Sequence, residues 1–115
     1  MLNVIAEALV SVSGRAAGSA VGLHARLEIL LDNEWVLLAE RRTDGNGLIE
    51  EWGAAGGHRG LYRVVFDVDR YFAGLGLTPG YPEVTVGFRA SEEGVGYGVT
   101  LTFSPHQYTA VLTSS

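Results

Sequence analysis

Short hydrophobic segments recur along the whole chain, and turn-forming residues separate them. Inside several segments apolar and polar side chains alternate, which is typical of strands with one buried face. Asp32-Asn33-Glu34 and Thr43-Asp44-Gly45-Asn46-Gly47 indicate tight turns, because Asn and Gly adopt positive φ at low cost. The pattern predicts strands at residues 4–13, 23–31, 35–42, 48–51, 61–66, 83–89, 96–104 and 107–114.

Residues 67–74 depart from this alternation. Asp67 suits the N-cap of a helix, apolar residues follow at helical spacing, and Gly74 closes the run. We expect this segment to be the only helix. The length of 115 residues suits one core, so residues 1–115 are expected to form a single domain. The predicted fold class is all-β, a two-sheet β-sandwich of about eight strands with one short helix.

The last two predicted strands have two different faces. Large apolar side chains at alternate positions are expected to face the core: Tyr97, Val99, Leu101, Phe103, Tyr108, Ala110 and Leu112. The opposite face is small and largely hydroxyl-bearing: Gly98, Thr100, Thr102, Thr109, Val111 and Thr113. This face is too apolar to be simply solvated and too polar to be core. It favours an oligomer interface or a wet ligand channel.

The charge balance excludes two classes of partner. The net charge is -5 and there is no basic stripe, so the chain lacks the cations that neutralise nucleic-acid phosphates or anionic membrane surfaces. We therefore expect no nucleic acid and no membrane partner. The expected partners are small molecules and further copies of the same chain.

The residue types that are missing limit the chemistry. The basic residues are all arginines, which excludes Schiff-base chemistry on a lysine. The absence of Cys excludes disulfides, a thiolate nucleophile and cysteine-based metal sites, and we expect neither a metal nor a cofactor. The first seven residues lack the basic region of a signal peptide, and no segment is long enough to cross a membrane. A cytoplasmic protein is therefore expected.

Several motifs carry a family resemblance: Leu61-Tyr62-Arg63-Val64-Val65-Phe66-Asp67, Tyr71-Phe72, Tyr81-Pro82-Glu83-Val84-Thr85-Val86 and Ser104-Pro105. They resemble the transthyretin and 5-hydroxyisourate hydrolase family, and residues 19–28 also fit its second strand. The resemblance covers nearly the whole chain, and the Tyr-Pro-Glu-Val run after a Tyr-Phe helix is specific. The chain is identified as a diverged member of this family.

The resemblance implies a transthyretin-like (prealbumin-like) sandwich of two four-stranded sheets, assembled as a homotetramer that is a dimer of dimers. A channel then runs through the tetramer, lined by the first strand and the last two. In transthyretin this channel carries thyroid hormones, and in the hydrolases it holds the active site. The hydroxyl-bearing face of the last two strands suits such a channel.

The hydrolases open ring-shaped ureide substrates with a His on the first strand, an Arg after the third, a His on the seventh and a C-terminal Tyr-Arg-Gly-Ser. The resemblance places these positions on Val10, Leu48, Gly98 and residues 111–114, which read Val-Leu-Thr-Ser. A one-residue slip in the first strand would exchange Val10 for Leu9 or Ser11, and neither is a His. Hydrolysis of 5-hydroxyisourate by the family mechanism is therefore not expected.

We expect the channel to be lined by Val10, Val12, Leu48, Gly98, Thr100, Thr102, Thr109, Val111, Thr113 and Ser114. Three further residues are candidates for its mouth: Glu50, Trp52 and His106. Trp52 could form an aromatic wall for a flat ligand or pack at the edge of the sandwich. The other histidines, His24 and His58, lack metal-ligand spacing and are interpreted as surface residues.

Three functions remain open. The first is a homotetrameric protein that binds a small, largely apolar or ring-containing molecule in its channel. The second is an enzyme of different chemistry, for example a cyclase of specialised metabolism, which relies on shape and desolvation. The third and least favoured is a residual 5-hydroxyisourate hydrolase of purine catabolism. Because no acid or base is evident in the channel, the sequence slightly favours binding, and no catalytic residue is assigned.

Overall fold

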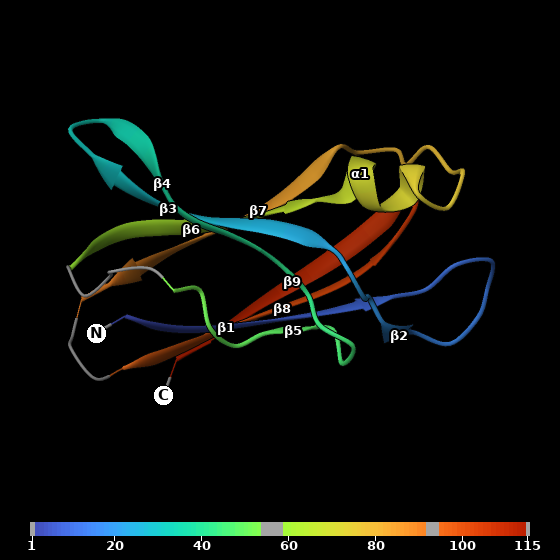
Figure 1. Cartoon of the computed structure of the whole chain (residues 1–115), viewed down its shortest axis with the longest axis horizontal. Helices are drawn as coiled ribbons and strands as arrows, with labels where there is room; N and C mark the ends of the chain where they lie inside the picture. The colour runs from blue at the N-terminus through green and yellow to red at the C-terminus, as the bar shows by residue number, and fades with distance from the viewer. Residues whose placement is uncertain (1, 54–58, 92–94, 115) are drawn as a thin grey trace.

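The computed structural model describes residues 2–53, 59–91 and 95–114 (Figure 1). Within these ranges the chain forms nine strands and one helix. The elements are β1 (Asn3–Val10), β2 (Gly18–Ser19), β3 (His24–Leu31), β4 (Glu34–Arg42), β5 (Leu48–Ile49), β6 (Gly60–Asp67), α1 (Val68–Ala73), β7 (Glu83–Ala90), β8 (Gly96–Ser104) and β9 (Gln107–Ser114). In the described part of the chain no helix is long and apolar enough to cross a membrane.

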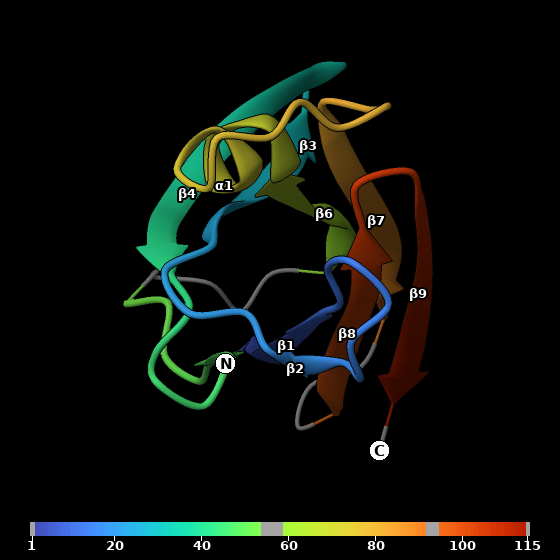
Figure 2. The ribbon, with the colours of Figure 1, turned by 90° about the vertical axis from the view of Figure 1, so that its right-hand side faces the viewer.

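The strands form two sheets that pack against each other as a sandwich (Figures 1 and 2). The first sheet has the order β2-β1-β8-β9, and β5 also pairs with β1. The second sheet has the order β4-β3-β6-β7. β1 and β8 run parallel, whereas the other paired strands are antiparallel. The predicted all-β, two-sheet sandwich with one short helix is confirmed.

The first sheet differs in detail from the four strands expected for it, because β2 adds a fifth strand. β2 has only two residues in a run of small side chains, so it is too short to show an apolar–polar alternation. β1 ends at Val10 rather than at Ser13. The positive φ of Ser13 (55°) and Gly14 (75°) cannot continue an extended strand.

The core lies between the inner faces of the two sheets. Val64 and Phe66 of β6 and Leu101 and Phe103 of β8 are at most 2% exposed. Each buried side chain of this size contributes about 1.5–3 kcal/mol relative to an exposed one. Phe103 also packs edge to face against Phe72 of α1, with ring centroids 5.5 Å apart. The helix is therefore part of the same core.

The helix forms where the sequence predicts it. The Asp67 carboxylate accepts a hydrogen bond from the Arg70 N–H (3.1 Å), which satisfies one of the free donors of the first turn. Val68 and Phe72 are buried on one side of the helix, and Gly74 is its C-cap.

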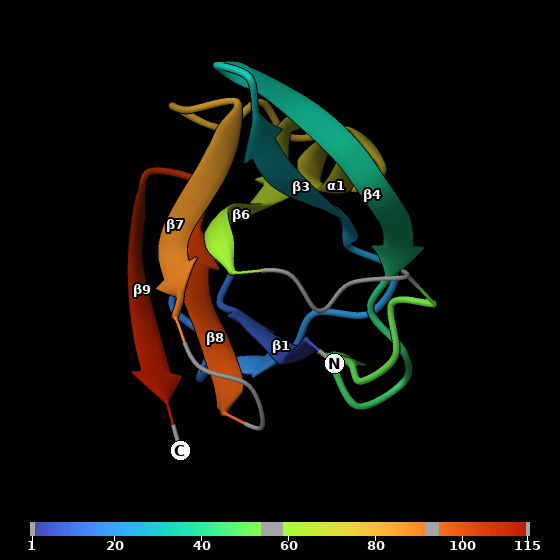
Figure 3. The same ribbon diagram turned by 90° about the vertical axis from the view of Figure 1, so that its left-hand side faces the viewer.

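β9 is the least buried of the long strands. All of its residues are exposed, including Tyr108 (49%) and Leu112 (43%). The prediction that Tyr108, Ala110 and Leu112 face the core is therefore wrong for the single chain. Alternation does place these side chains on the inner side, but β9 forms the edge of its sheet and has little of the second sheet opposite it (Figures 2 and 3).

Candidate functional site

The outer face of the first sheet brings most of the predicted channel residues together. Strand register arranges this face in three rows: Ser19, Leu9, Thr102 and Thr109; then Leu48, Glu7, Thr100 and Val111; then Ile5, Gly98 and Thr113. Neighbouring strands lie about 4.8 Å apart, so residues of one row can contact the same small molecule.

Two hollows open on this face on either side of the middle row. One has a volume of about 280 Å³, and Ser11, Thr102 and Thr109 contribute to its lining. The other has a volume of about 390 Å³, and Gly98 and Thr113 contribute to its lining. Ser, Thr and Gly residues form much of these walls, together with larger side chains that include Tyr108 in the first hollow and Ile5 and Tyr97 in the second. A second copy of the chain against this face would convert the two open hollows into an enclosed site.

The alternation of β1 is opposite to the predicted one. Val4, Ala6 and Ala8 are at most 3% exposed and form the inner side of the strand. Val10 continues that inner side, and Val12 also packs against the core. The prediction that Val10 and Val12 line the channel is therefore wrong. The outward-facing positions of β1 are Ile5, Glu7 and Leu9.

Glu7 is the functional candidate that sequence reasoning missed. It lies in the middle row, paired with Leu48 on β5 and with Thr100 on β8. Of the β1 residues, Glu7 is thus the one that adjoins Leu48 on the outer face. On this face Glu7, rather than Val10, lies beside Leu48, so the outer face does carry a carboxylate.

A signal for Glu7 was present in the sequence. It is the one ionisable residue within the apolar run of residues 4–10. An ionised carboxylate is costly to bury without a partner, so this strand is expected to turn Glu7 outward. That requirement alone decides which side of β1 faces outward.

Leu48 is held in place by the turn that precedes β5. The Asp44 carboxylate accepts hydrogen bonds from the Asn46 N–H (2.8 Å) and the Leu48 N–H (3.0 Å). The Ala8 N–H donates to the Gly47 carbonyl (2.9 Å), which ties the turn to β1. A Cβ at Gly47 would lie 2.6 Å from the Ala8 carbonyl oxygen, and the φ of Gly47 is 76°. Both conditions require glycine here.

Gly98 and Thr113 fit closely across β8 and β9. They are direct partners in the antiparallel ladder. A Cβ built at Gly98 would lie 2.6 Å from Thr113 Oγ1, so the threonine hydroxyl fills the space above the glycine. Ser114 pairs with Tyr97, and its side chain therefore lies on the opposite side of β9 from Thr113, although it borders the same hollow.

The three predicted mouth residues behave differently. Trp52 is 6% exposed, and its Nε1–H donates to the Val4 carbonyl (3.1 Å). Its placement at the channel mouth is therefore wrong, because the indole packs in the core with its donor satisfied. Glu50 is exposed directly after β5. His106 is exposed in the turn between β8 and β9.

Tyr81 holds this turn. Its hydroxyl donates to the Ser104 carbonyl (2.6 Å) and the Gln107 carbonyl (3.2 Å). The Gly80 N–H donates to the Pro105 carbonyl (2.7 Å). Burial, together with the neighbouring Tyr108, raises the pKa of Tyr81 to about 12. The loop before β7 thus fixes one end of the exposed strand β9.

His24 lies away from the three rows, on the second sheet. His24 is half-buried on β3, and burial together with Arg70 and Arg42 lowers its pKa from the ordinary value. His58 lies outside the described residues. Among the residues that the structure places, no three His, Asp or Glu side chains are grouped closely enough to hold a metal ion.

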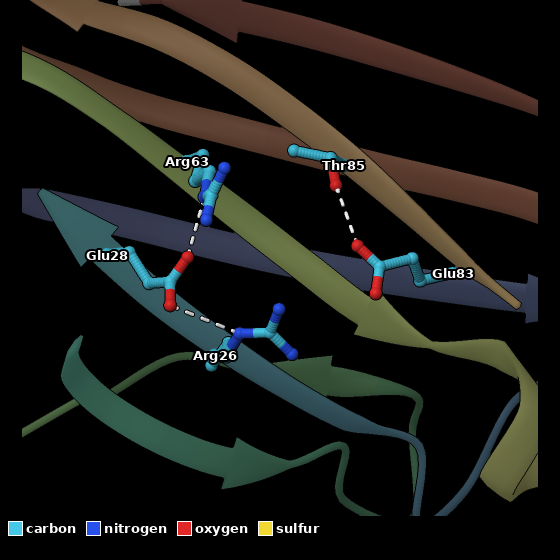
Figure 4. A network of polar contacts seen from close by, with 5 residues as sticks. All are labelled: Arg26, Glu28, Arg63, Glu83 and Thr85. Atoms are coloured by element: carbon cyan, nitrogen blue, oxygen red, sulfur yellow. Dashed lines mark hydrogen bonds and ion pairs between the residues drawn. The ribbon is translucent and has the colours of Figure 1, made fainter. Parts of the chain in front are cut away.

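The outer face of the second sheet has a different character (Figure 4). The Glu28 carboxylate accepts from Arg63 Nε at 2.6 Å and from Arg26 Nε at 3.2 Å. Arg63 also lies over the Trp35 ring, 4.1 Å from its centroid. The Glu28 side chain is only 11% exposed. This cluster is satisfied by its own members, which is the arrangement of a structural network.

Comparison with known proteins agrees with this architecture. Residues 8–111 match the HIUase/transthyretin family. The chain belongs to this family. A family relative from Schizosaccharomyces pombe (strain 972), named probable 5-hydroxyisourate hydrolase, is 31% identical over 74 residues. The match covers 63% of this chain and 59% of that relative.

Two solved transthyretin structures have the same fold. Transthyretin from Sparus aurata superposes with a TM-score of 0.85 at 26% identity, over 97% of both chains. Sea bream transthyretin in complex with thyroxine also gives 0.85, at 27% identity over 97% of this chain and 95% of the other. The predicted family and the transthyretin-like fold are therefore confirmed.

Proposed function

We propose that this protein is a homotetrameric, transthyretin-like binding protein that holds a small, largely apolar or ring-containing molecule in a central channel. The observation that carries the proposal is the outer face of β1, β8 and β9. It combines hydroxyl groups, short side chains and two hollows with a single charge. A relative with the same fold was solved in complex with thyroxine, a ring-containing ligand.

Self-association is supported by β9. This strand ends its sheet, so its outer backbone groups have no partner strand in the single chain. Its inner side also leaves Tyr108 and Leu112 exposed. Pairing with a second copy along this edge would satisfy the backbone and cover the apolar side chains. Stacking two such dimers through the outer face of the first sheet would enclose the channel, giving a dimer of dimers.

The site also supports the loss of the family hydrolase chemistry. The positions that correspond to the catalytic Arg and the second His hold Leu48 and Gly98, and the terminal tetrapeptide is Val-Leu-Thr-Ser at residues 111–114. Glu7 is a carboxylate and cannot supply the imidazolium or guanidinium that this mechanism uses. We propose that the protein does not hydrolyse 5-hydroxyisourate.

The cytoplasmic location remains a prediction from the sequence.

The test combines sedimentation with titration of phenoxyphenol, a neutral two-ring probe. We expect a tetramer that binds phenoxyphenol, and we expect Val111→Trp to abolish binding by filling the middle row. Thr85→Trp, on the exposed outer face of β7, is the matched control and should leave binding unchanged. A monomer at micromolar concentration would overturn the proposal, as would binding that survives Val111→Trp. Turnover of freshly generated 5-hydroxyisourate would refute the claimed loss of hydrolysis.

Glu7 favours one second candidate, an enzyme of different chemistry such as a cyclase that uses the same channel. A carboxylate beside apolar and hydroxyl-bearing walls can act as a general base or acid. If the protein is such an enzyme, Glu7→Gln would abolish turnover of its substrate, whereas the tetramer and the binding of phenoxyphenol would persist. Retained turnover in Glu7→Gln would exclude Glu7 as the acid or base.

A further inference from the structure

Glu7 is the only charged residue in the three rows of the outer face. The other members of the rows are hydroxyl-bearing, aliphatic or glycine: Ile5, Leu9, Ser19, Leu48, Gly98, Thr100, Thr102, Thr109, Val111 and Thr113. A molecule that lies across the middle row therefore meets one negative charge and no positive charge. Charge is the property of this face that discriminates most sharply between ligands.

Glu7 is half-buried. In the described ranges no arginine, histidine or hydrogen-bond donor is paired with it, whereas Glu28 on the other sheet is held by two arginines. The neighbours of Glu7 in its row, Leu48 and Thr100, supply no cation. Glu7 is thus an ionisable group with its capacity to accept hydrogen bonds left for something outside the chain.

The missing hydrogen-bond donor for Glu7 becomes important when the outer face is covered. When a ligand or a second copy covers the face, Glu7 loses water, and an unpaired carboxylate in such a place is costly. A ligand that brings a cationic nitrogen removes this cost through a charge-assisted hydrogen bond. A ligand that brings a carboxylate adds repulsion instead. The negative net charge of the whole chain, -5, acts in the same direction at longer range.

We propose that the channel selects ring-containing molecules that carry a protonated amine or amidine, with the cationic nitrogen paired to Glu7. This inference rests on the proposed function, because it names the ligand class of the same channel. The rings would lie along the hydroxyl-bearing and aliphatic rows, and Val111 would contact them from β9. Glu7 is then the residue that determines specificity in the channel.

The test uses three probes with the same two-ring core: neutral phenoxyphenol, cationic phenoxybenzylamine and anionic phenoxybenzoate. We expect wild-type protein to bind the amine about tenfold or more tightly than the acid, the effect of one hydrogen bond to a charged group. Glu7→Gln should remove most of this preference, and Glu7→Lys should reverse it. Glu34→Gln makes the same change in net charge on the second sheet and should keep the preference.

The outcomes distinguish failure of the Glu7 inference from failure of the channel itself. If phenoxyphenol binds but the two charged probes bind equally, the Glu7 inference is overturned and the channel stands. The same holds if the amine preference survives Glu7→Gln in a variant that sediments like wild type. If no probe binds, the channel itself is refuted and the role of Glu7 fails with it.

Discussion

Two glutamates lie on the outer faces of the two sheets, and they differ in their burial and in their side-chain partners. Glu28 on β3 is nearly buried between Arg26 and Arg63, and Arg63 in turn lies over Trp35. Glu7 on β1 is half-buried, and among the described residues its side chain has no ion-pair or hydrogen-bond partner. A charge that the chain satisfies itself contributes to stability. A half-buried charge without a partner in the chain is available to an external group.

The largest expected effect separates these two roles directly. Glu28→Ala should lower the free energy of unfolding by about 1–2 kcal/mol, because it leaves Arg26 and Arg63 without their acceptor, and both remain partly solvated. Glu7→Ala should change stability by less than about 0.5 kcal/mol, as expected for a site without partners. Urea denaturation of the two variants measures the difference. Equal losses would erase the distinction between the faces.

The next effect concerns the support of the exposed strand β9. Tyr81→Phe removes the hydroxyl that donates to Ser104 and Gln107 and should cost about 1 kcal/mol. Tyr108→Phe is the matched control, since its ring also packs against Tyr81 (centroids 5.0 Å) and its hydroxyl has no described hydrogen bond. Urea denaturation at neutral pH measures both variants. A loss in Tyr108→Phe as large as in Tyr81→Phe would show that ring packing, not the hydroxyl, holds β9.

The same hydroxyl predicts an alkaline limit. The folded pKa of Tyr81, about 12, lies above the ordinary value of 10.0. Its contribution to stability is therefore complete below pH 10 and declines as the pH rises through about 12. The stability difference between wild type and Tyr81→Phe should narrow over that range. A constant difference would show that the folded state tolerates the phenolate.

A smaller effect compares two glycines on outward-facing strand positions. At Gly87 on β7 an added Cβ would meet the Tyr62 carbonyl oxygen at an ordinary 3.8 Å, so Gly87→Ala should stabilise by about 0.5 kcal/mol. At Gly98 the Cβ would meet Thr113 Oγ1 at 2.6 Å, so Gly98→Ala should bring no such gain. Thermal unfolding measures both. The gain should return in a Thr113→Ala background, and its failure to return would place the obstacle elsewhere.

The smallest effect tests a titratable residue on the second sheet. Burial and the nearby arginines lower the folded pKa of His24 below its ordinary value of 6.5. The neutral His24 side chain therefore makes its full contribution to the free energy of unfolding above pH 6.5. This contribution is lost as the pH falls through the lower, folded pKa. His24→Gln should lose less stability than wild type between pH 7.5 and pH 5. Identical slopes for the two proteins would contradict this.

Strict alternation made the end of the chain predictable. Residues 96–104 and 107–114 form strands with the predicted bounds. Large and small side chains alternate throughout residues 97–104, and Tyr108 and Leu112 keep the same spacing of large side chains in the last strand. β1 breaks this rule. Its buried side carries Ala6 and Ala8, whereas its outer side carries Ile5 and Leu9, so hydrophobicity alone assigns the faces in reverse. The family resemblance placed Val10 in the channel, and this placement concealed Glu7.

Trp52 illustrates the second limit of sequence reasoning. Its indole lies in the core because the Val4 carbonyl, distant in sequence, accepts its N–H. Neither the partner nor the burial can be read from the residues around Trp52. The exposure of β9 is a related case. Alternation predicts which way a side chain points, but burial also requires a second layer of the protein opposite the strand, and the sequence of β9 does not show whether that layer is present.

The parallel pairing of β1 with β8 joins the two ends of the chain. The middle row consequently draws Glu7 from the first strand, Leu48 from the middle of the sequence, and Thr100 and Val111 from the last two strands. Such long-range pairs pay a large loop-closure entropy before they gain any contact, which slows folding. The middle row is thus complete only when both ends of the chain have met.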